Sequence, residues 1–192
     1  MKKLLILAIV AALSFWGCSE NSSLTQPTDV QQQQSFLKVN TDNVSELSVE
    51  AKAALGVENV NTLSKSWLQS STTKVIGEEG GNVRFFLADN GAYSLGKIGV
   101  DGNSFPGETD LTISMLDDEI ATLDITSSLQ LAGTVELTVC FIGVDVKASD
   151  IVNFVYLDGE VDPDNSGILV GNGWVVVVKA QLDHLSRFGF TK

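Results

Sequence analysis

Histidine and cysteine are scarce in this chain of 192 residues, which contains one histidine and two cysteines. Zinc sites are built from three or four His, Cys or carboxylate ligands, so a site based on His and Cys is excluded. Basic residues are also few, with 12 Lys and Arg against 24 Asp and Glu and a formal net charge of −12. Nucleic acids and anionic membrane surfaces attract an excess of Lys and Arg, so neither is expected as a partner.

The chain lacks an apolar run long enough to cross a bilayer comfortably. Its longest run, residues 4–13, covers about 15 Å as a helix, against about 30 Å for a bilayer core. Lys2 and Lys3 precede the run, and Gly17 and Cys18 follow it closely. This order is typical of a secretory signal peptide. The glycine before the cysteine resembles the bacterial lipoprotein signal, which implies that Cys18 is acylated and becomes the mature N-terminus.

We therefore predict a signal peptide over residues 1–17 and a lipid anchor at Cys18. The alternative is ordinary cleavage of a signal peptide, in which Cys18 has no role. If Cys18 is acylated, Cys140 is alone and no internal disulfide can form. Residues 18–40 contain a run of four glutamines and few large apolar side chains. Such a composition cannot bury enough surface to offset the entropy of ordering, and it predicts a disordered tether.

Residues 41–72 predict a short helical segment in front of the main domain. Ser45 is a candidate N-cap, and Gly56 is a candidate for the end of the helix. An apolar stripe lies between them at helical spacing: Leu47, Ala51, Ala54 and Leu55. Trp67 is either a core anchor of this segment or an exposed contact, and we favour the anchor.

From residue 73 to the C-terminus, the apolar residues alternate with a period of two, as in half-buried strands. About nine or ten short strands, separated by Gly, Asn, Asp and Pro turns, predict an all-β domain. We expect an antiparallel β-sandwich or a partly closed barrel. The clearest alternating sets are Val83, Phe85 and Leu87; Leu111, Ile113 and Met115; Val135, Leu137, Val139 and Phe141; Val152, Phe154 and Tyr156; and Trp174, Val176, Val178, Ala180 and Leu182. Residues 174–178 are apolar on both faces and predict a covered central strand.

The order of landmarks in residues 73–192 resembles the ZU5-type β-domain. The residues that carry the resemblance are Val75 and Ile76; Gly80, Gly81, Asn82 and Val83; Ile98, Gly99 and Val100; Asn103, Ser104 and Phe105; and Thr109, Asp110, Leu111, Thr112 and Ile113. The tail from Leu182 to Phe188 is similar to the closing strand of bacterial lipoproteins with ZU5-like domains. The resemblance implies a β-sandwich that serves as a structural or protein-interaction module without enzymatic activity.

Asp183, His184 and Ser186 supply the residue types of a hydrolase triad. In a strand, however, His184 and Ser186 share one face while Asp183 points to the other. The chain also lacks the Gly-x-Ser-x-Gly elbow of α/β-hydrolases. We therefore expect these residues to form structural hydrogen bonds, and we expect no catalytic residues.

An acidic loop near residue 160 begins like a calcium loop. Asp158, Asp162, Asp164 and Ser166 offer the oxygen ligands that calcium prefers. The twelfth position of the loop is Gly173 rather than a bidentate acid, so an EF-hand is excluded and a plain acidic turn is favoured. No cofactor other than calcium is a candidate. Cys140 lies on the polar side of its strand pattern, but a free cysteine usually behaves as a small hydrophobe.

The function expected from these features is that of a non-enzymatic, lipid-anchored cell-envelope protein, structural or protein-interacting, at the outer membrane. Its expected partners are the membrane, through the anchor, and an envelope or surface protein. The alternative is a calcium- or glycan-binding β-sandwich module at the cell surface.

Overall fold

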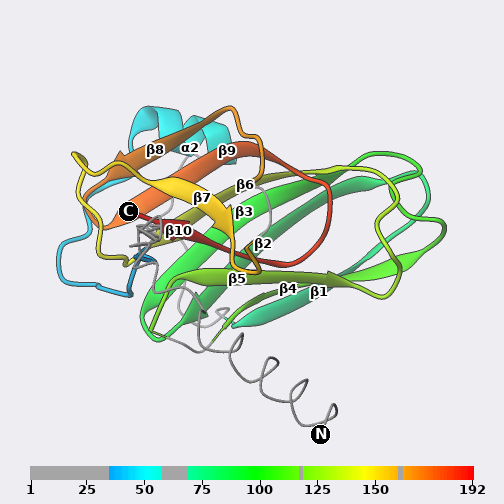
Figure 1. The fold of residues 1–192 in the computed structure, drawn as a ribbon, viewed down its shortest axis with the longest axis horizontal. Coiled ribbons are helices and arrows are strands. Elements are labelled where there is room, and N and C mark those ends of the chain that lie inside the picture. Colours follow the sequence, from blue (N-terminus) through cyan, green and yellow to red (C-terminus); the bar gives the residue numbers. More distant parts are fainter. Residues whose placement is uncertain (1–34, 58–68, 117–118, 160–161) are drawn as a thin grey trace, which may run out of the picture. The chain divides into compact units, whose positions relative to one another are not determined.

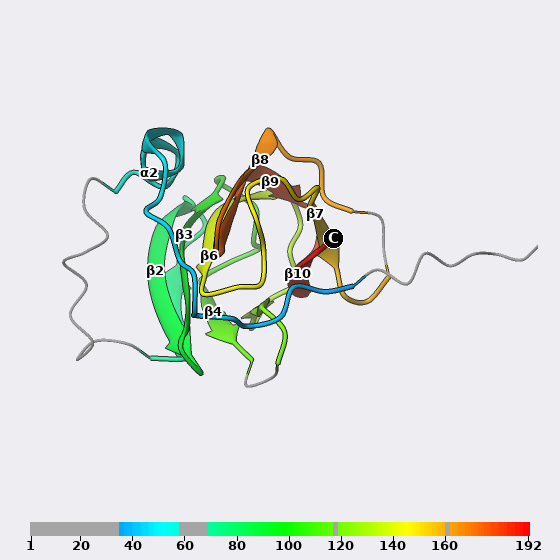
Figure 2. The same cartoon turned by 90° about the vertical axis from the view of Figure 1, so that its left-hand side faces the viewer.

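Two antiparallel five-stranded sheets pack face to face in the computed structural model, which describes residues 35–57, 69–116, 119–159 and 162–192 (Figures 1 and 2). The strand order is β1-β4-β5-β10-β7 in sheet 1 and β2-β3-β6-β9-β8 in sheet 2. The sheets do not close into a barrel, so the β-sandwich prediction is confirmed. The strands are β1 (Ser71–Ile76), β2 (Gly81–Asp89), β3 (Ala92–Val100), β4 (Thr109–Met115), β5 (Thr122–Ser127), β6 (Val135–Ile142), β7 (Asn153–Tyr156), β8 (Gly167–Gly171), β9 (Trp174–Leu182) and β10 (Arg187–Thr191).

The predicted alternation supplies the core between the two sheets. Side chains of one parity are buried on β2, β4 and β6, while most of their neighbours are polar or only partly buried. Phenylalanine rings fill the centre, where Phe141 lies edge-on to Phe190 with ring centroids 5.7 Å apart. Phe154 stacks on Phe188 at 5.6 Å. Contacts of this kind add to the free energy gained by burying the rings.

A β-bulge divides β9 into two halves of opposite parity. Val175 and Val177 enter the core, but the next core residues are Ala180 and Leu182. Lys179 has a positive φ of 52°, and its backbone N–H donates to Thr138 Oγ1 at 3.1 Å, where the β6–β9 register shifts. The prediction that residues 174–182 alternate without interruption is therefore wrong, because one extra residue on the strand reverses its faces.

The helix α2 (Val49–Leu55) covers the outer face of sheet 2. Ser48, rather than the predicted Ser45, is its N-cap, and Ser48 Oγ accepts a hydrogen bond from Ala51 N at 3.1 Å. Gly56 ends the helix in the left-handed conformation, as predicted. The apolar side of the helix packs on a cluster of sheet 2 residues: Leu95, Cys140, Trp174 and Val176. β9 lies between β6 and β8, so the expected covered central strand is confirmed.

Residues 35–40, called the strap from here on, bind to both sheets at one end of the sandwich. Leu37 N donates to Phe190 O at 2.8 Å, and Leu37 O accepts from Ala121 N at 2.9 Å, both in sheet 1. Asn40 N donates to Gly143 O at 2.7 Å, just beyond β6 of sheet 2. The Leu37 side chain is fully buried in the core.

The prediction that the disordered tether extends to residue 40 is therefore wrong for the strap. Backbone hydrogen bonds and one buried leucine order the strap despite its polar composition. Residues 18–34, with the predicted anchor at Cys18, lie outside the described residues, as does Trp67. No helix in the described ranges is long and apolar enough to cross a membrane.

We expect Leu37→Ala to lower the free energy of unfolding by about 2–5 kcal/mol, because it removes a fully buried leucine and leaves a cavity. Urea denaturation followed by circular dichroism measures the change. Lys38→Ala is the matched control, since the Lys38 side chain is exposed and the change should cost less than about 0.5 kcal/mol. Equal stability of the two variants would show that the strap does not belong to the core.

Candidate functional site

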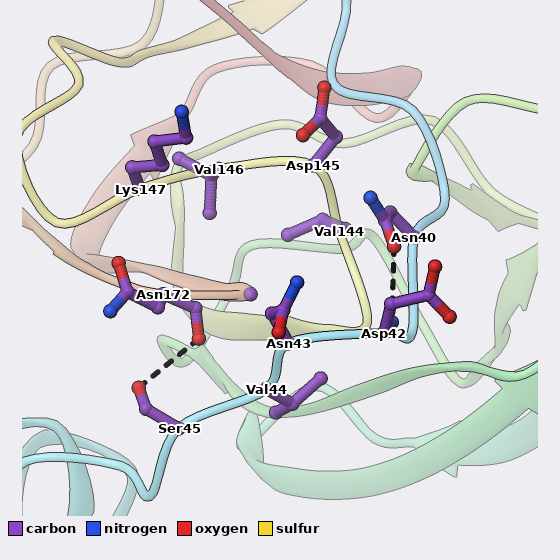
Figure 3. A pocket seen from close by; sticks show the side chains of 11 residues that line it. Asn40, Asp42, Asn43, Val44, Ser45, Val144, Asp145, Val146, Lys147 and Asn172 are labelled. Carbon is purple, nitrogen blue, oxygen red and sulfur yellow. Dashed lines mark hydrogen bonds between the residues drawn. The ribbon is translucent and has the colours of Figure 1, made fainter.

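A cleft of about 620 Å³ opens at the end of the sandwich that the strap crosses (Figure 3). Three separate segments form its walls: residues 40–45, residues 144–147 after β6, and the tight turn of Asn172 and Gly173 between β8 and β9. We call it the end cleft. Most of its lining side chains are amides, carboxylates or hydroxyls, and three valines supply the apolar part: Val44, Val144 and Val146.

Hydrogen bonds hold two of the cleft's asparagines in fixed orientations. Asn40 Oδ1 accepts from Asp42 N at 3.0 Å, and Asn172 Oδ1 accepts from Ala148 N at 3.1 Å. Each side-chain oxygen is thus bound to a backbone amide of the cleft wall, which leaves the Nδ2 group of each asparagine as a donor. In Figure 3, the side chains of Asn40 and Asn43 lie on either side of Val144.

Ser45, predicted as a helix cap, instead joins the cleft to the core. Its hydroxyl donates to Asn172 O at 3.1 Å and accepts from Trp174 Nε1 at 3.1 Å (Figure 3). Gly173, at a φ of 76°, makes this approach possible, because a Cβ there would lie 2.9 Å from Asn43 O. The cleft wall is therefore fixed by a glycine and a buried tryptophan.

A second polar cluster lies at the opposite ends of β9 and β10. His184 Nδ1 lies 2.8 Å from Asp183 Oδ1, and the imidazole stacks on the Tyr156 ring with centroids 4.1 Å apart. Tyr156 OH also donates to Asp183 Oδ1 at 3.1 Å. Burial and the bond to Asp183 raise the pKa of Tyr156, while bonds from His184 and Tyr156 lower the pKa of Asp183.

The geometry of this cluster differs from that of a hydrolase triad. Ser186 Oγ donates to Asp158 Oδ2 at 2.6 Å, so the hydroxyl binds a carboxylate rather than the imidazole. His184 Nε2 lies 3.6 Å from the same Asp158 oxygen. A triad needs the base in contact with the nucleophile. The cluster instead joins the β9–β10 turn to β7 and to the start of the acidic loop.

The four residues proposed as calcium ligands are not brought together as a carboxylate site. Asp158 is bound to Ser186, and the backbone of Ser166 pairs with Val178. Asp164 O accepts from Gln181 N, and partial burial raises the pKa of Asp162. Glu160 lies outside the described residues, and within those residues no group of three His, Cys, Asp or Glu side chains could hold a metal ion.

No pattern in the sequence marks the end cleft. Asn40 and Asp42 stood in or beside the polar stretch assigned to the tether, and Asn172 stood in a turn whose only evident role was to reverse the chain. These residues come from segments more than 100 positions apart, so no local spacing connects them. The only signal was the Gly-Asn-Gly turn at residue 172, which marks a close backbone approach without indicating what approaches.

Cys140 is fully buried beneath α2, and burial raises the pKa of its thiol. We therefore expect very slow reaction of native Cys140 with a thiol reagent, measured in the Cys18→Ala background so that one thiol remains. Leu55→Ala should speed the reaction at least tenfold, because it removes a neighbour of Cys140 on α2. Val49→Ala, on the exposed side of the helix, should leave the rate unchanged, and equal acceleration by both variants would contradict this packing.

Asp183 should contribute to stability in a pH-dependent way. Its pKa is lowered in the folded protein, so its contribution is present above the unfolded value of about 3.9 and is lost as the pH falls through the folded value. We expect Asp183→Asn to lower the melting temperature at pH 7, with the difference from wild type shrinking below about pH 4. Glu108→Gln, which removes an exposed carboxyl before β4, controls for the general effect of one charge. A difference that stays constant from pH 7 to pH 3 would contradict the assignment.

Comparisons with known proteins provide no further guide to the end cleft: no family model matches the chain, and no match was found among the curated proteins or the solved structures.

Proposed function

We propose that the chain is a lipid-anchored protein of the bacterial cell envelope, without enzymatic activity, whose β-sandwich acts as a binding module through the end cleft. The lipoprotein-like leader and Cys18 support the location. Ser19 and Glu20 after the cysteine do not resemble known inner-membrane retention signals, which favours the outer membrane. The ZU5-like order of landmarks supports the interaction role, since the resemblance implies a module without catalysis.

The observation that carries this proposal is the double role of the strap. The chain enters the sandwich at the strap, and Asn40 at the end of the strap lines the end cleft. Cys18 and Ser35 are 17 residues apart, and a fully extended chain of that length spans at most about 60 Å. An anchor at Cys18 would therefore keep the cleft within reach of components at the membrane surface.

The described contacts favour this role over the hydrolase and calcium alternatives. The Ser186 hydroxyl donates to Asp158, so Ser186 is not placed as a nucleophile for His184. Of the candidate calcium ligands, Asp158 is bound to Ser186 through its side chain, and within the described residues no group of three His, Cys, Asp or Glu side chains could hold a metal ion. The end cleft, by contrast, holds polar side chains that are exposed to solvent and oriented by backbone hydrogen bonds, namely Asn40 and Asn172.

Fractionation of cells that express the wild-type chain and Cys18→Ala tests the anchor. We expect the wild type in the membrane fraction and Cys18→Ala in the soluble extracytoplasmic fraction, because the thiol carries the lipid. Cys140→Ala is the matched control, since its thiol is buried and cannot carry an acyl chain. If Cys18→Ala fractionates like the wild type, the anchor and the proposed location are both wrong.

A further inference from the structure

The charges around the end cleft argue against an ionic ligand. Its walls hold two carboxylates, Asp42 and Asp145, and one ammonium group, Lys147, on a chain with a net charge of −12. Asp145 is in addition paired with Lys192, whose Nζ lies 3.4 Å from Asp145 Oδ2. Phosphates and other anions need an excess of positive charge, and cations need several converging carboxylates. Neither arrangement is present, so the cleft suits a neutral ligand.

The polar groups of the cleft match a ligand rich in hydroxyls. A hydroxyl both donates and accepts, and a planar amide or carboxylate can bind two neighbouring hydroxyls at once. The amides of Asn40 and Asn172 are held in place by backbone bonds before any ligand arrives. A ligand that binds these amides therefore needs to fix few further side-chain rotamers, which reduces the entropic cost of binding.

One valine completes the match to a sugar ring, which carries hydroxyls at its edge and C–H groups on its faces. Val44, which is 43% exposed, gives a C–H face an aliphatic surface to cover, while Val144 and Val146 are buried in the core. No aromatic ring lines the cleft, so the contact area is modest. A depression of about 510 Å³ adjoins the cleft and shares Asn40, Asp42 and Asp145 with it. The polar surface thus continues beyond the space of a single ring.

The position of the cleft argues against an extended peptide. Peptides commonly bind by adding a strand to an exposed sheet edge, where main-chain groups are available. The end cleft lies at strand ends, and its walls are the segment after the strap, the segment after β6 and the β8–β9 turn. Pairing along a sheet edge is not available there.

We propose that the end cleft is a binding site for a neutral oligosaccharide of the cell envelope, an inference that rests on the proposed binding function and names its ligand class. Asn40, Asn43 and Asn172 bind the hydroxyls, and Val44 contacts a ring face. The expected affinity is modest, and the anchor offsets it by holding many copies of the cleft at one surface.

Titration calorimetry of the full chain in detergent tests the inference, with chitotetraose, cellotetraose and maltotetraose as the probes. We expect saturable binding of at least one tetrasaccharide. Asn43→Ala should weaken it at least fivefold, because it removes an exposed amide that lines the cleft. Asn82→Ala, an equally exposed amide on β2, should leave the affinity unchanged.

A second measurement separates a neutral from a charged ligand. A rise in salt from 50 to 500 mM should change the affinity less than twofold, because salt screens surface charges and the binding of a neutral sugar does not depend on them. A strong fall of the affinity with salt would overturn the neutral class. Binding that survives Asn43→Ala would overturn the site.

The inference and the proposed function fail in different ways. If no tetrasaccharide binds while a photo-crosslinking residue at position 43 captures an envelope protein in cells, the oligosaccharide is wrong and the binding module stands. If Cys18→Ala remains with the membrane, the anchor is wrong whatever the cleft binds. If all three tetrasaccharides bind Asn43→Ala and the wild type with equal affinity, the sugars do not bind specifically at the end cleft.

Discussion

The strap is the constraint on which the rest of the structure depends. The two sheets face each other across an apolar core, which is non-directional and fixes no particular orientation by itself. The strap adds directed backbone hydrogen bonds to both sheets, at Phe190 and Ala121 on one side and at Gly143 on the other. Leu37 places the centre of the strap in the core. The same segment continues into the wall of the end cleft, so the geometry of the cleft follows from the geometry of the core.

In the part of the chain that the structure describes, α2 covers the outer face of sheet 2 where its side chains are apolar. The helix packs on Cys140 of β6 and on Trp174 and Val176 in the first half of β9. Beyond the bulge at Lys179 the outer side chains are polar, and Lys179 Nζ lies 3.7 Å from Glu136 Oε2. The bulge thus allows one strand to serve an apolar helix contact at one end and a solvated surface at the other, while both halves still supply the core.

The two polar sites occupy opposite ends of β9 and differ in what their side chains are free to do. The groups around His184 are engaged with one another: Asp183 with His184 and Tyr156, and Asp158 with Ser186. Such a network stabilises the turn between β9 and β10. The asparagines of the end cleft are oriented by the backbone but keep their amide donors, which is the condition for recognition of a polar ligand.

The sequence alone determined the fold class, because strand alternation, turn residues and the helix stripe are local patterns that repeat with a fixed period. The burial of Val83, Phe85 and Leu87 and the end of α2 at Gly56 follow from such patterns. The sequence did not predict the position of the β-bulge at Lys179, because the bulge depends on a hydrogen bond to Thr138 of a neighbouring strand. The strap and the end cleft were decided by tertiary structure. Asn40, Val144 and Asn172 carry no common signal in the chain, and they meet because the strap and β6 end, and β9 begins, at the same end of the sandwich.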